Sequence, residues 1–580
     1  MMRTFVIYSM LLCVLVHKSE CVFGTFTRVV ETSYGKVRGR RSVSGQNLFY
    51  GIPYATSERF QPPKEPASWN GIFDAVRRFG SCSQTVSLLR LGSEDCLSLD
   101  LYVPERAKPG DKIPVLVFLH GGAYYYGSKL HYDPEFLVTK NVITAIINYR
   151  VGALGFLCLN GIANLGLKDQ VAALKWIKKN IAAFGGDPDN VTMSGQSAGA
   201  SAAAMHMLSE SSKGLFHKLL LMSGSPLTPW AFNTEPQTPA FQDARKLTRA
   251  SSEKEVHDFF AYASVDEVLT VASDTSLNPR YFKYSPCVDS NSSEPFFKDT
   301  PFNLIKSGRF NKVPILTGVT SVEGLLFYGL NSEKTLQELD EQFVERLPSV
   351  FSWCSEKDKR EIANEMRSQY FGSEPIRRAQ YRRIIDFYSD WIAYSTSQAF
   401  VDLMVKSSDQ PVYSYLFHYE GDRNFAKSLL GQGLEVEGAS HSDDIFYVFK
   451  PAGLSLILSS RDRLFIDRLT TMITNFMKYG NPTPKKSHLL PVIWPPANSS
   501  MTMRLDEHLS IIKAEPSTHQ QFYLNLLCTY GQPGPRAASA GCPGVSSVVW
   551  SRLCTVAGRY CSSPPPPCKL CTEDCPRHLF

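Results

Sequence analysis

Apolar runs of strand length alternate with helical patterns over about residues 26–528. Ile113–Leu119 is continuously apolar, and residues 142–147 are apolar apart from Thr144, which is typical of strands covered on both faces. Residues 167–184 carry apolar side chains at helical spacing and stop at a Gly-Gly pair, where a helix would end. Further strands are expected at Lys218–Met222, 314–319 and Val412–Phe417. The alternation predicts an α/β domain whose catalytic loops follow the carboxyl ends of parallel strands.

One of these runs, residues 191–193, leads into the sequence Gly195-Gln196-Ser197-Ala198-Gly199 and then into an alanine-rich stretch, 198–208. Strand, sharp turn and helix form the context in which G-x-S-x-G presents a serine nucleophile. We expect the two glycines to supply strained backbone angles and a close approach of helix to strand. The Ser197 hydroxyl should then lie near the positive end of the helix. The motif also occurs by chance, so the chain must supply a base, an acid and an oxyanion hole as well.

Two later segments can supply the acid and the base. Glu323 lies in the segment 320–324, which directly follows the predicted strand 314–319, and His441 lies in the polar segment 438–444. Taken alone, such a glutamate is usually a helix N-terminal charge, and such a histidine is usually a surface or core residue. The order Ser197, Glu323, His441 is, however, the order of triad residues in hydrolases with a nucleophile elbow. The three residues together predict a catalytic triad.

At this point the chain resembles a known family, the type-B carboxylesterase and cholinesterase-like family of α/β-hydrolases. The resemblance covers roughly residues 26–528 and includes several short stretches in the right order. They are SEDCL at 93–97, HGGA at 120–123, NYR at 148–150, GLKDQ at 166–170, FGGDP at 184–188, GQSAGA at 195–200, SGSP at 223–226 and G-x-x-H at 438–441. The resemblance implies an α/β-hydrolase fold: a large, mostly parallel central sheet flanked by helices, with a deep catalytic gorge.

Residue by residue, the resemblance implies that Ser197 is the nucleophile, Glu323 the acid and His441 the base. A serine esterase of this kind forms an acyl-enzyme and needs no cofactor and no metal. Ala123 stands where many family members have a third glycine, which still leaves its N–H available. The backbone donors implied for the oxyanion hole are Gly122, Ala123 and Ala198.

The cysteine pattern fits an oxidising compartment. Cys82 and Cys96 bracket a short loop with polar flanks, which favours a local disulfide, and they match the family's first disulfide. Cys158, Cys287 and Cys354 stand far apart in sequence, and we expect them to be buried thiols. The resemblance also implies two structural ion pairs, Arg59 with Glu94 and Arg150 with Asp169.

The choice of ester is constrained by what surrounds the predicted site. The loop between Cys82 and Cys96 holds no aromatic residue, and neutral Gln196 precedes the nucleophile, where choline esterases usually carry Glu. A cationic choline head would therefore find neither an aromatic face nor a carboxylate. A small lipophilic ester is favoured instead. The expected substrate-binding side chains are Trp230, which matches an acyl-pocket position, Phe327 and Tyr124.

Three finer interpretations remain open. GQSAGA and the pattern Gly438-x-x-His441-x-x-Asp444 are similar to those of insect juvenile hormone esterases. The run 441–444 also resembles insect general, antennal and pheromone-degrading esterases. A catalytically inactive adhesion or binding member of the same fold is the alternative from another class. Such members typically lose a triad residue, and this chain keeps all three.

The N-terminus and the sequons suggest secretion. Residues 1–21 contain Arg3 and then an apolar stretch too short to span a bilayer, as a signal peptide does; an N-terminal core strand is the alternative. Of the sequons at Asn190, Asn291 and Asn498, the first is expected to be buried, so Asn291 and Asn498 are the glycosylation candidates. The net charge of +6 is spread along the chain without a basic block, so no nucleic-acid partner is expected. No later stretch reaches membrane-spanning length without charges, so no membrane-spanning segment is expected.

Residues 529–580 differ from everything before them. They hold six of the 14 cysteines and a proline run, without periodicity. The spacing Cys568-x-x-Cys571-x-x-x-Cys575 could bind zinc, but no histidine pair or second C-x-x-C completes a site. We interpret this tail as disordered or irregular, with a disulfide-linked appendage as the alternative.

Overall fold

The computed structural model describes residues 25–530 except 79, 87–88, 160, 273–281, 353, 452–457 and 498–500, and the side chain of Cys528. The predicted signal peptide, Asn498 and the tail beyond residue 530 lie outside the described residues. None of the described helices is both long enough and apolar enough to cross a lipid bilayer.

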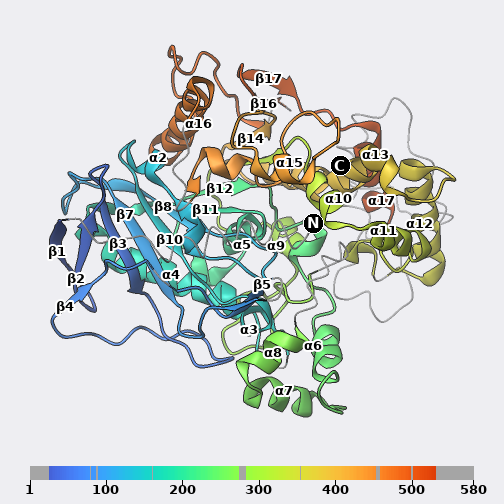
Figure 1. Ribbon diagram of the computed structural model, residues 1–580, viewed down its shortest axis with the longest axis horizontal. Helices are drawn as coiled ribbons and strands as arrows, with labels where there is room; N and C mark the ends of the chain where they lie inside the picture. The colour runs from blue at the N-terminus through green and yellow to red at the C-terminus, as the bar shows by residue number, and fades with distance from the viewer. Residues whose placement is uncertain are drawn as a thin grey trace, which may run out of the picture.

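A single 13-stranded sheet runs through the molecule in the order β1-β2-β3-β7-β10-β8-β11-β12-β13-β14-β16-β17, with β4 paired to β2 (Figure 1). The middle of the sheet, from β10 to β16, is parallel, and both ends are antiparallel apart from the parallel pairing of β4 with β2. The strands are β1 Phe26–Thr32, β2 Gly35–Arg41, β3 Asn47–Pro53, β4 Ile72–Asp74, β7 Ser98–Val103, β8 Ile113–Leu119, β10 Ile143–Ile147, β11 Gly186–Gln196, β12 Lys218–Met222, β13 Ile315–Thr320, β14 Val412–Phe417, β16 Met501–Leu505 and β17 Ser510–Lys513.

The parallel register brings several strand ends to one edge of the sheet. Gly195 of β11 is level with Leu119 of β8 and with Leu221 of β12, and Met222 is level with Gly318 of β13. The predicted strands 113–119, 218–222 and 412–417 match β8, β12 and β14. Strand β11 begins five residues earlier than expected, because a register irregularity lets the chain from Gly186 onward join β8.

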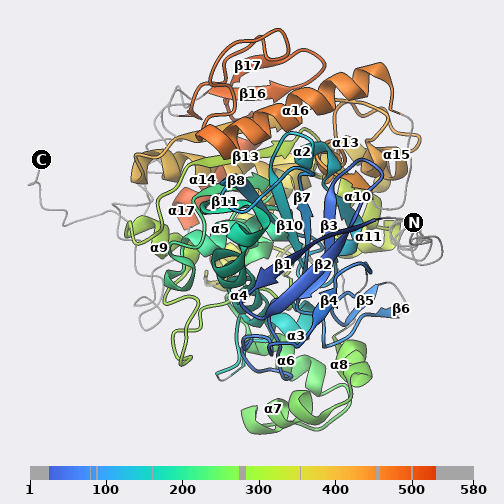
Figure 2. The same ribbon diagram turned by 90° about the vertical axis from the view of Figure 1, so that its left-hand side faces the viewer.

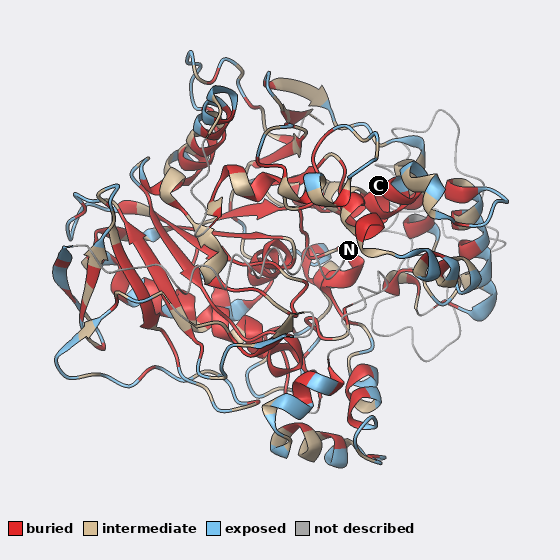
Figure 3. Cartoon of the chain, in the orientation of Figure 1, coloured by how far each residue is buried: buried red, intermediate tan, exposed pale blue. Residues whose placement is uncertain are grey.

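Helices cover both faces of the sheet (Figure 2). Val115, Val117 and Leu119 of β8 pack in a core cluster with α4 (Leu165–Asn180) and α5 (Ala198–Met207). The alternate residues of β8 pack in a second cluster with α2 (Glu135–Val138) and α16 (Ser460–Tyr479). Both faces of the strand are therefore apolar and buried, as its unbroken hydrophobic run predicts (Figure 3).

Most other helices follow β12 or β13 and lie beyond the sheet, where their outer faces are exposed (Figure 3). One group, drawn in yellow to red in Figure 1, packs around a π-helical turn, Asp390–Tyr394. Besides α2, α4, α5 and α16, the α-helices of the described chain are α3 Gly152–Phe156, α6 Gln237–Ala244, α7 Glu253–Tyr262, α8 Val265–Val271, α9 Pro301–Lys306, α10 Leu325–Leu330, α11 Glu333–Glu341, α12 Glu356–Phe371, α13 Tyr381–Ser389, α14 Ser395–Ser407, α15 Phe425–Leu430 and α17 Thr518–Tyr530.

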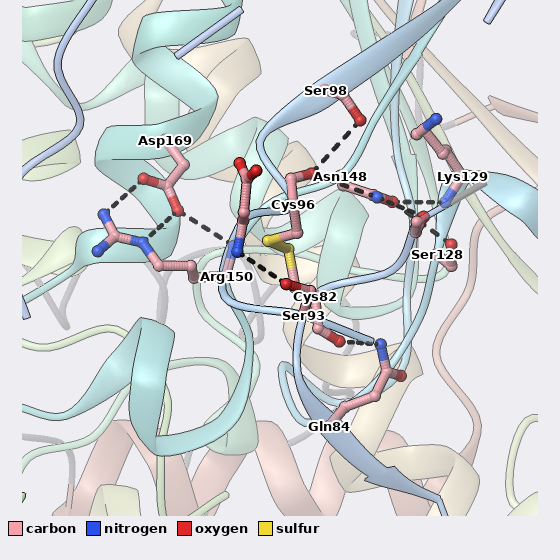
Figure 4. The surroundings of a disulfide bond; sticks show 12 residues. Cys82, Gln84, Ser93, Cys96, Ser98, Ser128, Lys129, Asn148, Arg150 and Asp169 are labelled. Carbon is pink, nitrogen blue, oxygen red and sulfur yellow. Dashed lines mark hydrogen bonds and ion pairs between the residues drawn. A yellow bond between two sulfur atoms is a disulfide. The ribbon is translucent and has the colours of Figure 1, made fainter. Parts of the chain in front are cut away.

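Two disulfides join described residues, and one of them corrects a sequence expectation. Cys82–Cys96 closes the short loop that contains β5 (Gln84–Val86) and β6 (Leu89–Leu91) (Figure 4). Cys158 and Cys287, expected to be thiols, form a disulfide across 129 residues of sequence. The Asn164 side-chain amide bonds both the N–H and the carbonyl of Cys287, which holds the two segments together. Cys354 is a buried thiol, as expected.

Both ion pairs implied by the resemblance are present, in different surroundings. Arg150 and Asp169 are buried and make two side-chain hydrogen bonds of 2.8 and 2.6 Å (Figure 4). Arg59 and Glu94 make a similar pair, but their side chains are 20% and 33% exposed. Loss of one buried partner leaves an uncompensated charge, so the Arg150 pair is the more important for stability.

Candidate active site

The nucleophile elbow lies at the carboxyl edge of the sheet, where β11 ends at Gln196 and α5 begins at Ala198. A Cβ at Gly195 would lie 2.2 Å from the carbonyl carbon of Gly199, and one at Gly199 would lie 2.2 Å from the carbonyl oxygen of Leu119. The expected close approach is therefore confirmed. The strained angles belong instead to Ser197 itself, with φ 58° and ψ −126°, and neither glycine has a positive φ.

Glu323 follows β13 in a loop that is anchored from several sides. Its side chain is 2% exposed, and its Oε1 accepts a hydrogen bond from the Thr320 N–H at 2.8 Å. The Gly324 N–H donates to Ser389 Oγ at 2.8 Å, and the Tyr394 hydroxyl donates to the Thr320 carbonyl at 2.9 Å. These two anchors come from the end of α13 and from the π-helical turn. Sequence reasoning missed both, because no local pattern indicates them.

The loop that carries the candidate base His441 is bound directly to the loop that carries the candidate acid Glu323. The Val322 N–H donates to the Ala439 carbonyl at 2.9 Å, and the Ala439 N–H donates to Ser321 Oγ at 3.0 Å. His441 Nδ1 then lies 2.5 Å from Glu323 Oε2. Because Nδ1 faces the carboxylate, the neutral ring carries its proton on Nδ1 and presents a lone pair at Nε2.

Burial and pairing act on both groups of this pair. Burial raises the pKa of Glu323, but the charge of His441 and the hydrogen bonds that the carboxylate accepts, from His441 and from the Thr320 N–H among others, together outweigh burial, and the pKa is lowered. Burial lowers the pKa of His441, but the charge of Glu323 and its hydrogen bond outweigh burial, and the pKa is raised. Each partner therefore stabilises the charged form of the other.

Nε2 of His441 faces the amide of Gln196 rather than the nucleophile in this structure. Gln196 Nε2 lies 3.3 Å from His441 Nε2 and donates to Ser442 Oγ at 2.9 Å. Over the residues that the structure describes, the Ser197 hydroxyl has no hydrogen bond to His441. Ser197 is, however, the next residue in the chain after Gln196, whose side chain contacts the imidazole. Catalytic hydrogen bonds often form only in the substrate complex.

Two more carboxylates lie buried beside the base. Asp443 accepts hydrogen bonds from the N–H groups of Ser440 and Ala426, each at 2.8 Å. Asp444 accepts one from the Tyr415 hydroxyl at 3.1 Å. Burial raises the pKa of each carboxyl to about 7. The sequence marked Asp444 only as part of a motif, and it gave no signal that either carboxyl is so close to ionisation at neutral pH.

Three backbone N–H groups expected to form the oxyanion hole lie on the loop after β8 and at the start of α5. The loop has an unusual run of positive φ, with 111° at Gly122, 56° at Ala123 and 62° at Tyr124. In the described part of the chain, no acceptor is paired with the N–H of Gly122, Ala123 or Ala198. A Cβ at Gly121 would lie 3.1 Å from Cβ of Ser197, so this loop passes directly over the elbow.

The three expected substrate-binding side chains occupy different places. Trp230 packs against Phe282 with ring centroids 5.2 Å apart, and Phe327 stacks on Tyr388 at 5.4 Å. Tyr124 is fully buried against Phe156, within the core cluster.

Other sequence candidates lie away from this centre. Asn291 is exposed in a loop, whereas Asn190 is half-buried and its side-chain oxygen accepts a hydrogen bond from Lys218. Among the described residues, no group of three or more His, Cys, Asp or Glu side chains could hold a metal ion.

Comparison with known proteins agrees with this geometry. The model of the carboxylesterase family matches residues 27–523. Esterase FE4 of Myzus persicae is 31% identical over 87% of this chain and 95% of its own length. Juvenile hormone esterase of Tribolium castaneum is 30% identical over 80% of this chain and 86% of its own length.

A solved structure is similar as well. It is juvenile hormone esterase from Manduca sexta with OTFP covalently attached, which superposes with a TM-score of 0.77 at 29% identity and covers 86% of this chain and 98% of its own. The architecture here is therefore the α/β-hydrolase fold. With the matching family model and these relatives, the chain belongs to the carboxylesterase family and is a carboxylic ester hydrolase.

Proposed function

We propose that this protein hydrolyses lipophilic carboxylic esters through an acyl-enzyme on Ser197, with His441 as base, Glu323 as acid and no metal or cofactor. The observation that carries the proposal is the Glu323–His441 pair at 2.5 Å, at the same sheet edge as the elbow. This pair fixes the tautomer in which Nε2 can take a proton.

The proposed reaction has two halves. Nε2 of His441 takes the proton of the Ser197 hydroxyl while the oxygen attacks the ester carbonyl, and Glu323 stabilises the imidazolium that forms. His441 then gives this proton to the leaving alcohol, which departs and leaves an acyl-enzyme. A water attacks the acyl carbonyl in the same way, the acid leaves, and Ser197 recovers its proton.

The oxyanion of each tetrahedral intermediate would be held by the N–H groups of Gly122, Ala123 and Ala198. Their lack of an acceptor within the described residues supports this assignment. Loss of one such donor typically costs about 3 kcal/mol in the transition state. The negative charge also lies at the N-terminus of α5, where the helix dipole favours it.

The substrate class is inferred from the neutral and apolar surroundings. The residue beside the nucleophile is Gln196, and the loop closed by Cys82 and Cys96 has no aromatic side chain. Trp230 and Phe327 are the proposed contacts to an acyl or alcohol chain in a deep apolar gorge. Tyr124 belongs to the oxyanion loop and its side chain is fully buried against Phe156, so it is proposed to anchor this loop to the core.

Juvenile hormone is the specific candidate among lipophilic esters. Relatives named juvenile hormone esterase from two insects, and a solved structure of a third, favour it. A relative named venom carboxylesterase-6 and the esterases of Myzus persicae keep a broader specificity open. We further propose secretion after removal of residues 1–21, with a glycan at Asn291, which is exposed.

Covalent labelling tests the enzyme proposal and its inactive alternative together. An organophosphate should phosphorylate Ser197, seen as a mass shift on the peptide that carries it, and block hydrolysis in proportion. A folded sample that is neither labelled nor active would support the non-catalytic alternative. A panel of kcat/KM values for juvenile hormone, long-chain alcohol acetates and short naphthyl esters would then rank the substrates.

A further inference from the structure

The side chain of Gln196 occupies a position that the reaction scheme leaves without a function. It is 5% exposed and lies between the oxyanion loop and the base loop. On one side a Cβ at Gly121 would lie 2.9 Å from Gln196 Oε1, so a larger residue there would displace the amide. On the other side Gln196 Nε2 reaches His441 Nε2 at 3.3 Å and Ser442 Oγ at 2.9 Å.

The backbone conformation of Ser442 orients its Oγ toward the Gln196 amide. Its φ of 74° is in the left-handed region, which is uncommon for a residue with a side chain. The resulting turn presents Oγ to Gln196, directly after His441 in sequence. Backbone strain of this kind persists where the surrounding contacts determine it.

We propose that Gln196 is a positioning residue for the base, whose amide donates to Nε2 of the neutral His441 imidazole and holds the ring between turnovers. The proposal rests on the proposed function of His441. An amide suits this position because its NH₂ group is a hydrogen-bond donor that carries no charge. This group donates to the Nε2 lone pair of the neutral ring and so stabilises the neutral form. A carboxylate at this position could accept a hydrogen bond only from the charged ring. An apolar side chain could form a hydrogen bond with neither the neutral nor the charged ring.

The same geometry makes the amide a competitor of the nucleophile. While Gln196 donates to Nε2, the lone pair that must take the Ser197 proton is engaged. Substrate binding must therefore transfer Nε2 from the amide to the hydroxyl. The neutral amide also adds no charge to a ring that already faces Glu323 and lies near Asp443 and Asp444.

The test is the pH dependence of Ser197 phosphorylation by an organophosphate, measured on the full chain as a second-order rate constant from about pH 5 to 9. Its acid limb reports the pKa of the base in the resting enzyme. In Gln196→Glu the added carboxylate favours the imidazolium, so the acid limb should move to higher pH by about one pH unit or more. Gln196→Met keeps the side-chain volume but removes the donor to the neutral ring, so its acid limb should also move to higher pH, by a smaller amount than in Gln196→Glu. Gln337→Glu adds the same charge on the exposed face of α11 and should leave the limb in place.

The outcomes separate this proposal from the one on which it rests. If wild-type Ser197 is labelled and the folded Gln196→Glu and Gln196→Met variants keep the wild-type limb, the positioning proposal is wrong and the esterase mechanism stands. If wild-type Ser197 is not labelled at all, both proposals fail. If Gln196→Glu does not fold, a limb in Gln196→Met that coincides with wild type still overturns the positioning role.

Discussion

The acid–base side and the nucleophile side of the site are built in opposite ways. Glu323 and His441 sit on loops that bind each other and the body of the fold, and their own contact is 2.5 Å. Around Ser197, in contrast, N–H groups point to no acceptor in the described chain and the backbone is strained. One side is complete without substrate, and the other is left open for the groups that substrate brings.

Of the predicted changes, removal of the Ser197 hydroxyl, on the nucleophile side of the site, should lower activity the most. We expect Ser197→Ala to lower kcat by roughly 10⁵–10⁶-fold, because no other group can form the acyl-enzyme. Thermal unfolding should stay near wild type, since the change removes one partly exposed hydroxyl. Substantial esterase activity in this variant would contradict the assignment.

On the acid–base side, Glu323→Gln keeps the shape of the side chain but removes its negative charge. We expect kcat to fall by about 10⁴-fold, because the tautomer and the imidazolium both lose their support. Burst and steady-state measurements on an activated ester will show whether acylation is the slowed step. An unchanged kcat would mean that the observed Glu323–His441 pair is structural only.

Gly121→Ala tests whether activity depends on the close packing of the oxyanion loop against the elbow. The added methyl would lie 2.7 Å from the Gln196 carbonyl oxygen and 3.1 Å from Ser197 Cβ, so the oxyanion loop must shift away from the elbow. A misplacement of about 1 Å costs on the order of 10²-fold in kcat/KM. Thermal unfolding near wild type would show that a loss of activity comes from the shifted loop and not from unfolding. Wild-type activity in a folded Gly121→Ala variant would argue against tight packing of the two loops.

The smallest expected effect is a change in pH dependence. The base must be neutral, so kcat/KM should fall as pH drops through the pKa of His441. Asp444 is one of the charges that raise this pKa, although Glu323 is the larger. Its own pKa of about 7 leaves it partly ionised near neutrality. Asp444→Asn should therefore move the acid limb to lower pH by less than about one unit. A limb that moves to higher pH has the wrong sign for this account.

Much of the fold could be predicted from the sequence because strands and the elbow are encoded by short, continuous stretches of residues. Mostly apolar runs of strand length predicted the bounds of β8, β12 and β14, and the elbow motif predicted the position of Ser197 at a strand end. Glu323 could be placed because it follows β13 so closely.

Contacts between segments distant in sequence could not be found in this way. Cys158 and Cys287 have no local pattern that pairs them, although they are bonded. The anchors of the acid loop come from Ser389 and Tyr394, in a helix that no motif marks. The Gln196 contact to His441 likewise depends on how two loops meet, and the sequence suggested only that Gln196 is neutral.

The central claim is that the Ser197 oxygen becomes covalently acylated during turnover. Rapid acid quench of the enzyme with a slowly deacylated ester, followed by peptide mass spectrometry, tests it most directly. The account predicts the acyl mass on the Ser197 peptide, at near one equivalent, in wild type but not in Ser197→Ala. Rapid turnover of the same ester by wild type with no acyl group on Ser197 at any quench time would contradict it.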